Sequence, residues 1–348
     1  MWYVCATMFF LMSRGMSTEF NQRFIQNINI ESAQDLQKIY PNNPFFQLVT
    51  TRITTPQTTA SEIAKSSENY VKSSDVCGRT VNKPNTLIVN GLKTNQGDWP
   101  WITAIFLRKQ QNDRDSVFIC GGNLISELHI VSAGHCFMLE NSQTLNANIL
   151  DAYLGIFDLR KKDDPNVQLK KVQRIIVHPD FKYGTYSDAD IAILRLKSPA
   201  EYTPHVRPIC LWKWTADSRD IVGKKGTVIG WGRSELGEAP TDEPQLVELP
   251  VVSQEECRRS DPRFRFLTSQ RTLCAGAKDD SGPCNGDSGN GLILRVKDDS
   301  EFRWYLRGLT STSLLDKSRN VLCNLRQYII FTDVAQYDLW LKNVLTEE

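Results

Sequence analysis

The feature that most constrains the fold is a series of short apolar runs that begins near Ile88 and continues almost to the end of the chain. Each run is rich in Val, Ile and Leu and is bounded by Gly, Pro, Asn or Asp. The runs read WITAIFL, NLISELHIVSAG, VQRIIVH, IAILRL, GTVIGWG, QLVELPVV, GLILRV and YLRGLTS. Many short strands punctuated by turns are typical of an all-β sandwich or barrel.

The last segment, DVAQYDLWLKNVL, has a different periodicity. Apolar side chains recur there at the spacing of one helix face, which predicts a closing amphipathic helix. These side chains are Val334, Tyr337, Leu341, Val344 and Leu345.

The residues before the β-rich part differ in composition. Residues 1–15 contain the apolar run MWYVCATMFFLM, which matches a secretion signal in length and is too short to span a bilayer. No Lys or Arg precedes it, so we interpret it as a weak or truncated signal peptide. Residues 16–87 are polar and Thr/Ser-rich, and burial there cannot offset the entropy of ordering. They are predicted to be a flexible pro-segment or linker ahead of a folded domain at residues 88–348.

Charge and hydrophobicity exclude several classes of protein. The net charge of +1 gives no electrostatic reason to expect a nucleic-acid partner. After the first residues, no stretch is long and apolar enough to predict a membrane helix. The apolar fraction of 41% is ordinary for a chain that buries a core.

The chain has nine cysteines, and none forms a C-x-x-C pair, so zinc and thioredoxin-like sites have little support. Their wide, irregular spacing favours disulfides and hence a secreted, extracellular protein. Removal of the signal peptide would take Cys5 with it and leave an even number.

Three motifs carry residues with catalytic chemistry: His135 in VSAGHCF, Asp190 in SDADIAILRL and Ser288 in CNGDSGNG. Each has an ordinary structural interpretation when taken alone, as a core histidine, a capping aspartate or a turn serine. Together they form a catalytic set. A serine hydroxyl attacks well only when a base takes its proton, and an imidazole has a suitable pKa for that role. A carboxylate then holds the imidazole in the required tautomer.

With these motifs, further segments resemble the chymotrypsin-like serine protease family: IVNG at the start of the domain, RPICL at residues 207–211, GWG at residues 230–232, and Trp340 in the final helix. Within that family, CGRT at residues 77–80, LIVNG and SGPCNGDSG resemble the insect gastrulation-defective-like cascade proteases. The resemblance implies two packed six-stranded antiparallel β-barrels with a C-terminal helix, preceded by a largely flexible pro-segment.

The resemblance also implies an oxyanion hole and an activation step. The backbone N–H groups of Gly286 and Ser288 would form the oxyanion hole. A cut before Ile88 would free an ammonium group that pairs with Asp287. Leu87 precedes that bond, so a trypsin-like activator is not expected, and either an upstream protease that tolerates leucine or self-activation would make the cut.

The family's disulfide pattern uses every cysteine except Cys5. It implies one pair that tethers the pro-segment, one that holds the histidine loop, one in the second barrel, and one that ties the serine loop to the pocket wall. These pairs are, in the same order, Cys77–Cys210, Cys120–Cys136, Cys257–Cys274 and Cys284–Cys323.

The substrate pocket departs from the trypsin pattern. Gly282 would lie at its base, where trypsin-like members have an Asp, and its walls would include Ser311, Ser313 and Ile329. Side chains in place of wall glycines should make the pocket shallower. An arginine buried there without a carboxylate would carry an uncompensated desolvation cost. We therefore expect cleavage after an uncharged residue of small to medium size.

These observations predict a secreted serine endopeptidase zymogen that cuts a protein substrate, such as a downstream protease zymogen, in an extracellular cascade of development or immunity. No cofactor or metal is predicted, because the acidic pair of a calcium loop is absent after LGIFD. The alternative is a catalytically weak, protease-like binding or regulatory module. Leu87, the altered pocket and Asn290, which replaces a glycine in the family's usual GDSGGP, favour that alternative.

Overall fold

The computed structural model describes residues 76–80, 92–109, 116–183, 187–232, 241–284, 286–315 and 323–347. The predicted signal peptide, most of the predicted pro-segment, and Leu87 with Ile88 lie outside them. The chain divides into two units, at residues 1–67 and 68–348, and all described residues belong to the second. Among the described residues, no helix has the length and hydrophobicity to cross a bilayer.

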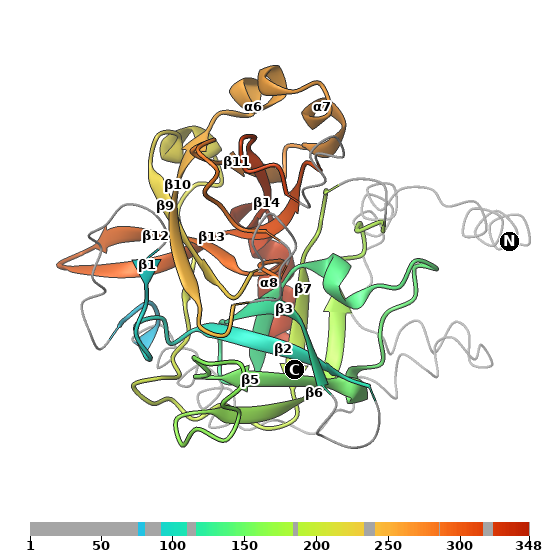
Figure 1. Cartoon of the computed structure of the whole chain (residues 1–348), viewed down its shortest axis with the longest axis vertical. Helices are drawn as coiled ribbons and strands as arrows, with labels where there is room; N and C mark the ends of the chain where they lie inside the picture. The colour runs from blue at the N-terminus through green and yellow to red at the C-terminus, as the bar shows by residue number, and fades with distance from the viewer. Residues whose placement is uncertain are drawn as a thin grey trace, which may run out of the picture. The chain divides into compact units, whose positions relative to one another are not determined.

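Six antiparallel strands form a closed barrel in the first half of this unit, drawn in cyan and green in Figure 1. Their order around the barrel is β2-β3-β4-β7-β6-β5. The strands are β2 (Ile102–Arg108), β3 (Ser116–Leu124), β4 (His129–Ser132), β5 (Leu150–Leu154), β6 (Gln168–Val177) and β7 (Ala192–Leu196).

The second half closes in the same way. β9 pairs with both β10 and β12, so the ring β9-β10-β11-β14-β13-β12 has no open edge. Its strands are β9 (Lys225–Gly230), β10 (Gln245–Val252), β11 (Thr272–Ala275), β12 (Gly291–Asp298), β13 (Glu301–Ser313) and β14 (Ile329–Asp333). Two short strands add to it, β1 (Leu92–Lys93) on β10 and β8 (Cys210–Leu211) on β13. The prediction of two six-stranded antiparallel barrels is confirmed.

The barrels pack on a shared core. One hydrophobic cluster contains Ile105 and Leu194 of the first barrel, Ile229 and Leu309 of the second, and Leu341 near the C-terminus. The β-branched and leucine-rich runs form strands because such side chains fit a pleated surface with buried neighbours. The core shared by the two barrels is therefore largely apolar.

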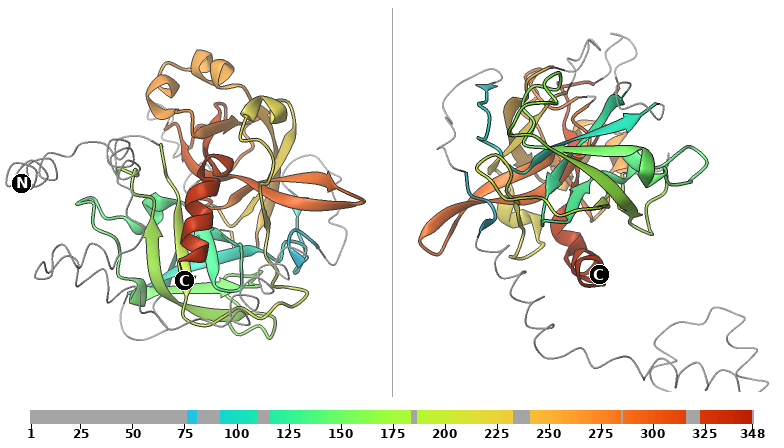
Figure 2. Two further views of the ribbon diagram at one scale, coloured as in Figure 1. Left: turned by 180° about the vertical axis from the view of Figure 1, so that it is seen from behind. Right: turned by 90° about the horizontal axis from the view of Figure 1, so that it is seen from below.

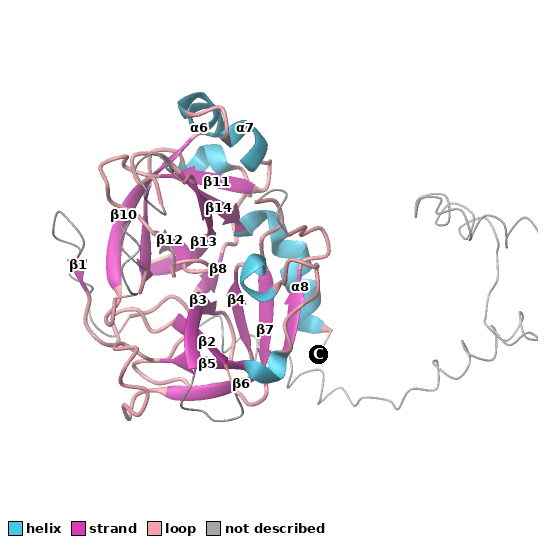
Figure 3. Ribbon diagram, turned by 45° about the vertical axis from the view of Figure 1, so that its right-hand side comes forward, coloured by secondary structure: helices cyan, strands magenta, loops and turns pink. Residues whose placement is uncertain are grey.

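Helices are few and mostly peripheral. α6 (Gln254–Ser260) and α7 (Phe264–Leu267) lie at the end of the second barrel away from the first (Figure 3). Short 3-10 turns are η1 (Gly134–Phe137), η2 (Ala147–Ile149) and η3 (Ser218–Ile221). The predicted C-terminal helix is confirmed as α8 (Asp338–Thr346). The first turn of the predicted segment is a separate 3-10 turn, η4 (Val334–Tyr337), which precedes α8. Figure 2 shows α8 from behind, in red, where its apolar face joins the shared core.

Four disulfides join the pairs implied by the resemblance: Cys77–Cys210, Cys120–Cys136, Cys257–Cys274 and Cys284–Cys323. Chain-entropy arithmetic gives about 3 kcal/mol for the loop closed by the second and about 4 kcal/mol for that closed by the fourth. The first attaches residues 76–80 to the barrels, where Gly78 N donates to Pro208 O at 2.8 Å and Gly78 O accepts from Trp304 N at 3.0 Å.

A fully buried ion pair joins Arg307 of β13 to Asp333, the residue that caps η4. Both side chains are inaccessible to solvent, and Arg307 Nη2 also donates to Ala216 O at 3.1 Å. The guanidinium lies 5.2 Å from the ring of Trp212. Burial lowers the pKa of Arg307 to about 10. Loss of either charge would therefore leave the other without its partner in an apolar surrounding.

We expect Arg307→Leu to lower the free energy of unfolding by roughly 3–5 kcal/mol, because Asp333 would remain charged and buried. The double variant Arg307→Leu/Asp333→Asn should recover much of that loss, since asparagine removes the charge but keeps an oxygen that can accept from Ala335 N. Urea denaturation with the disulfides intact measures both. Arg219→Leu, which removes an exposed ion pair with Asp217, should leave the midpoint unchanged. A double variant no more stable than the single one would contradict this account.

Candidate active site

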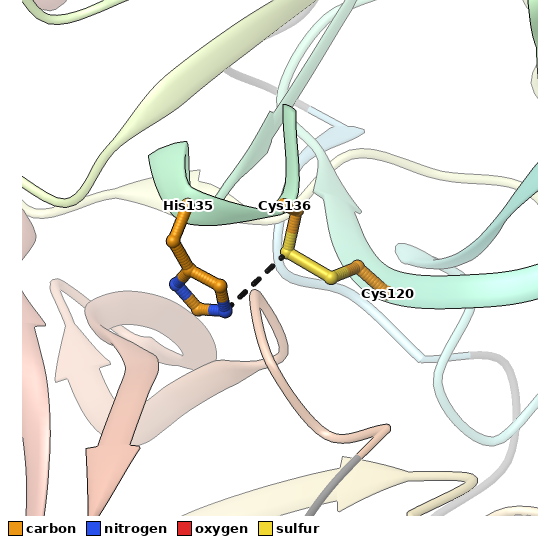
Figure 4. A group of neighbouring side chains, drawn as sticks. All are labelled: Cys120, His135 and Cys136. Carbon is orange, nitrogen blue, oxygen red and sulfur yellow. Dashed lines mark hydrogen bonds between the residues drawn. A yellow bond between two sulfur atoms is a disulfide. The ribbon is translucent and has the colours of Figure 1, made fainter. Parts of the chain in front are cut away.

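His135 lies on η1, directly after β4. The neighbouring Cys136 is bonded to Cys120 of β3, so the turn that carries the imidazole is covalently held to the barrel. Figure 4 shows the ring beside this disulfide, with His135 Nε2 3.8 Å from Cys136 Sγ. Although His135 and the two cysteines lie close enough for metal ligation, the sulfur atoms are bonded to each other and offer no thiolate.

Asp190 lies just before β7 and is 2% exposed. Its carboxylate accepts from His135 Nδ1 at 2.8 Å and from His135 N at 2.7 Å. The Ser311 hydroxyl donates to the same carboxylate at 2.5 Å, and the Thr332 hydroxyl donates to Asp190 O at 2.8 Å. Because Ser311 and Thr332 belong to β13 and β14, both barrels hold this aspartate.

The turn ahead of Asp190 has an uncommon backbone conformation. Ala189 has a φ of 55°, in the left-handed region that residues with a side chain rarely adopt. Its N–H donates to Tyr337 Oη at 3.0 Å, so a residue of η4 supports the turn. Strain of this kind persists where surrounding contacts over-determine it, and here those contacts direct Asp190 toward His135.

The electrostatics of His135 and Asp190 favour the charged pair. Burial lowers the pKa of His135, but the negative charge and hydrogen bond of Asp190 outweigh it, so this pKa is raised. Burial raises the pKa of Asp190, but His135 and the hydrogen bonds to the carboxylate outweigh it, so this pKa is lowered. The site therefore stabilises an imidazolium beside a carboxylate.

The loop that carries Ser288 docks on both barrels beside the histidine turn. Gly121 N donates to Ser288 O, and Gly289 N donates to Thr310 O, both at 2.9 Å. A Cβ on Gly289 would lie 2.2 Å from the Ser132 hydroxyl, so this glycine lies against the segment that leads into His135. Within the described residues, the Ser288 hydroxyl makes no hydrogen bond to His135. Such contacts are often long in the absence of substrate and tighten during the reaction.

The two residues before Ser288 fit tightly into the second barrel. Gly286 has a φ of 100°, a conformation that glycine adopts without steric cost. The Asp287 carboxylate is buried and accepts from Gly232 N at 2.9 Å and from Cys284 N at 3.0 Å. Burial raises the pKa of Asp287 to about 6, although these hydrogen bonds lower it. Its expected partner, Ile88, lies outside the described residues.

Three of the expected pocket residues, Gly282, Ser313 and Ile329, lie close together, whereas the fourth, Ser311, contacts Asp190. Ser313 and Ile329 are partners in the β13–β14 register. A Cβ on Gly282 would lie 2.7 Å from Ile329 Cδ1 and 3.2 Å from Leu325 Cδ2. The expected wall residue Ser311 instead directs its hydroxyl to Asp190.

The contributions of Leu325, Thr332 and Tyr337 to the site were not predicted from the sequence, which indicated Tyr337 only as part of the C-terminal helix face. The sequence around these residues gives no sign of the contacts, because each contact joins residues that are far apart in the chain and that only the fold brings together. A fourth, Ser311, was noted only as a pocket residue.

A family model named Trypsin matches residues 88–341. The chain therefore belongs to the trypsin family of serine proteases, which confirms the resemblance seen in the sequence. It is 35% identical over 277 residues to Serine protease gd of Drosophila melanogaster, an alignment that covers 71% of this chain and 50% of that protein.

Two further relatives carry names from clotting. The chain is 31% identical to Limulus clotting factor C of Carcinoscorpius rotundicauda, over 78% of this chain and 26% of the relative. It is 32% identical to the Proclotting enzyme of Tachypleus tridentatus, over 68% of this chain and 62% of the relative. The chain thus spans only part of the length of each of these relatives.

We expect the His135 imidazole to titrate above 6.5, and Asp190→Asn to bring its pKa below 6.5, because burial remains while the neighbouring charge is lost. Imidazole NMR titration measures this without any substrate. Asp180→Asn is the control, since that exposed carboxylate lies near a different histidine, His178. If the pKa of His135 is the same in Asp190→Asn as in the wild-type chain, the proposed charge coupling is contradicted.

Proposed function

We propose that this chain is a serine endopeptidase zymogen that hydrolyses peptide bonds with His135, Asp190 and Ser288. The observation that carries the proposal is the buried Asp190 carboxylate, held at 2.8 Å from His135 Nδ1 in a chain of the trypsin family. The docking of the Ser288 loop beside the histidine turn supports it.

In the proposed reaction, His135 Nε2 takes the proton of the Ser288 hydroxyl as its oxygen attacks the substrate carbonyl. The imidazolium that forms is stabilised by Asp190 and then returns the proton to the leaving amine. The backbone N–H groups of Gly286 and Ser288 donate to the negative oxygen of the tetrahedral intermediate. Water then attacks the acyl-enzyme. His135 takes the proton of the water and returns a proton to the Ser288 oxygen, which is now the leaving group.

We propose that the bond cut follows an uncharged residue of small to medium size. The pocket base at Gly282 has no carboxylate, and the adjacent Ile329 and Leu325 side chains fill space around it. Asp280, close by in sequence, pairs with Arg326 at 2.8 Å, and both are substantially exposed. Among the residues that the structure describes, a substrate arginine would therefore find no buried counter-charge at this base.

Activation by a cut after Leu87 follows from the same site. The new ammonium of Ile88 would neutralise the buried Asp287 carboxylate. The pKa of Asp287 is raised to about 6, so its contribution to folding is fully present below the ordinary carboxyl range and is lost as the pH rises through about 6. The ammonium would offset that loss at neutral pH. The residue before the cut fits the proposed pocket, so self-activation and an upstream protease are both compatible with it.

The proposed setting is an extracellular proteolytic cascade with a protein substrate, such as a second protease zymogen. Four disulfides favour an oxidising compartment. The relatives named as a clotting factor and a proclotting enzyme support the cascade.

A second candidate is a protease-like binding module with little turnover. Two observations favour it: the Ser288 hydroxyl makes no hydrogen bond to His135 within the described residues, and Asn290 replaces the family's glycine in the serine loop.

A fluorophosphonate probe, which reacts with an activated serine, separates the two candidates. Residues 84–87 are replaced by the recognition sequence of an added processing protease, so that cleavage exposes Ile88. We expect the cut chain to be labelled and Ser288→Ala to abolish labelling. Ser281→Ala, a serine of the same region, should leave it intact. A cut, folded chain that takes up no probe would favour the binding module.

A peptide library cut by the processed chain tests the pocket. We expect kcat/KM to be at least about tenfold higher after Ala or Leu than after Arg, because the described residues place no carboxylate at the pocket base. Ile329→Gly should move the preference toward larger apolar residues by removing the side chain beside Gly282. A preference for Arg over both Ala and Leu would overturn the specificity proposal.

A further inference from the structure

A buried amide lies against the buried carboxylate of Asp287. Asn290 is 1% exposed, and its Nδ2 donates to Asp287 Oδ1 at 3.2 Å. The family's usual motif has glycine at this position, and glycine has no side chain that could make this contact. It lies in the loop that carries Ser288, two residues after the proposed nucleophile.

The amide has little freedom to leave this position. A Cβ on Gly121 would lie 1.7 Å from Asn290 Oδ1, and one on Gly230 would lie 2.0 Å from Asn290 Nδ2. The backbone of Asn290 is held as well, since its N–H donates to Asp287 O at 3.0 Å and its carbonyl accepts from Thr310 N at 2.9 Å. The side chain thus fills a close-packed slot between the barrels.

The orientation of the amide follows the charge of the carboxylate. Asn290 Oδ1 is buried and has no hydrogen-bond partner, a condition that carries a free-energy cost. The opposite orientation would place this acceptor against Asp287 Oδ1, which is also an acceptor. The amide therefore acts as a donor to Asp287 and is more than a space-filling group.

No charged group competes for this role among the described residues. The other partners of the Asp287 carboxylate are the backbone N–H groups of Gly232 and Cys284. Asp287 forms no ion pair with any described side chain, and the other buried acid of the site, Asp190, is bonded to His135 and Ser311. Asn290 is thus the one side-chain donor to Asp287 in the described part of the chain.

We propose that Asn290 is a positioning residue whose amide holds the Asp287 carboxylate in its buried place from within the chain, so that the Ser288 loop is ordered before the ammonium of Ile88 arrives. This rests on the proposed function, because it concerns the regulation of the same site. Its consequence is that the uncut chain has a reactive serine loop, and that cleavage raises the reactivity from a basal level.

An isosteric exchange tests the donor role in the uncut chain, in a Ser288→Ala background that makes the measurement independent of catalysis. Asn290→Asp keeps the shape but places two carboxylates together. We expect it to destabilise the folded chain, raising the unfolding equilibrium constant by roughly tenfold or more at pH 8. The swap Asn290→Asp/Asp287→Asn removes the second charge and should recover part of that loss. Recovery is incomplete because the amide nitrogen at position 287 then faces the N–H of Gly232 or of Cys284.

A pH series gives a second readout of the same pair. The two carboxylates of Asn290→Asp would share a proton with an apparent pKa above the value of about 6 for Asp287 alone. The folded chain then binds this proton more tightly than the unfolded chain, so the destabilisation should be small at pH 5 and grow as the pH rises.

The matched control is Asn123→Asp with and without Asp287→Asn. Asn123 is equally buried, and its amide donates to Gly289 O at 3.0 Å in the same loop, but it has no contact with Asp287. We expect Asp287→Asn to give no rescue there. Equal stability of the Asn290→Asp variant with and without Asp287→Asn would overturn the donor role.

Fluorophosphonate labelling of the uncut chain with Ser288 intact tests whether the Ser288 loop is ordered before cleavage. We expect slow labelling of the wild-type chain and at least a tenfold slower rate for Asn290→Gly. An uncut wild-type chain that is inert while the cut chain is labelled would overturn the claim that the loop is ordered before cleavage. If neither form is labelled, the proposed protease function fails, and the stability exchange still decides the role of Asn290.

Discussion

The hydrogen bond between the Asp190 carboxylate and the His135 imidazole is the interaction on which the rest of the site depends. It joins two turns of the first barrel, and the hydroxyl of Ser311 extends it to the second. The carboxylate is buried, so its charge is tolerated only because three donors, His135 Nδ1, His135 N and the Ser311 hydroxyl, together with the nearby imidazole, compensate for lost solvation. The full set of hydrogen bonds to Asp190 therefore forms only when the two barrels are packed together.

Much of this arrangement could be predicted from sequence. The alternation of short apolar runs and turns is a local property, and it indicated an all-β fold before any family was considered. The helical spacing from Val334 to Leu345 likewise predicted the C-terminal helix, although the first turn is a separate 3-10 turn capped by Asp333. Barrel number and closure came only from the resemblance, because strand pairing depends on contacts between residues far apart in the chain.

The supporting contacts of the site were not predictable in the same way. Ser311 was expected in the pocket wall, yet its hydroxyl turns to Asp190. Tyr337 supports the turn at Ala189 across a long separation in sequence. Asn290 was visible as a departure from the family motif, but its partner was not, since the contact requires both the close approach of Gly230 and the inward direction of Asp287.

The Cys77–Cys210 disulfide has a consequence for how the chain stays connected as well as for stability. Any backbone break between Thr80 and Leu92 would leave the upstream piece covalently attached to the barrels. A surface or macromolecule that captures this piece would then retain the domain beside it, at the high effective concentration that tethering produces. One disulfide would thus keep the residues that precede such a break joined to the domain.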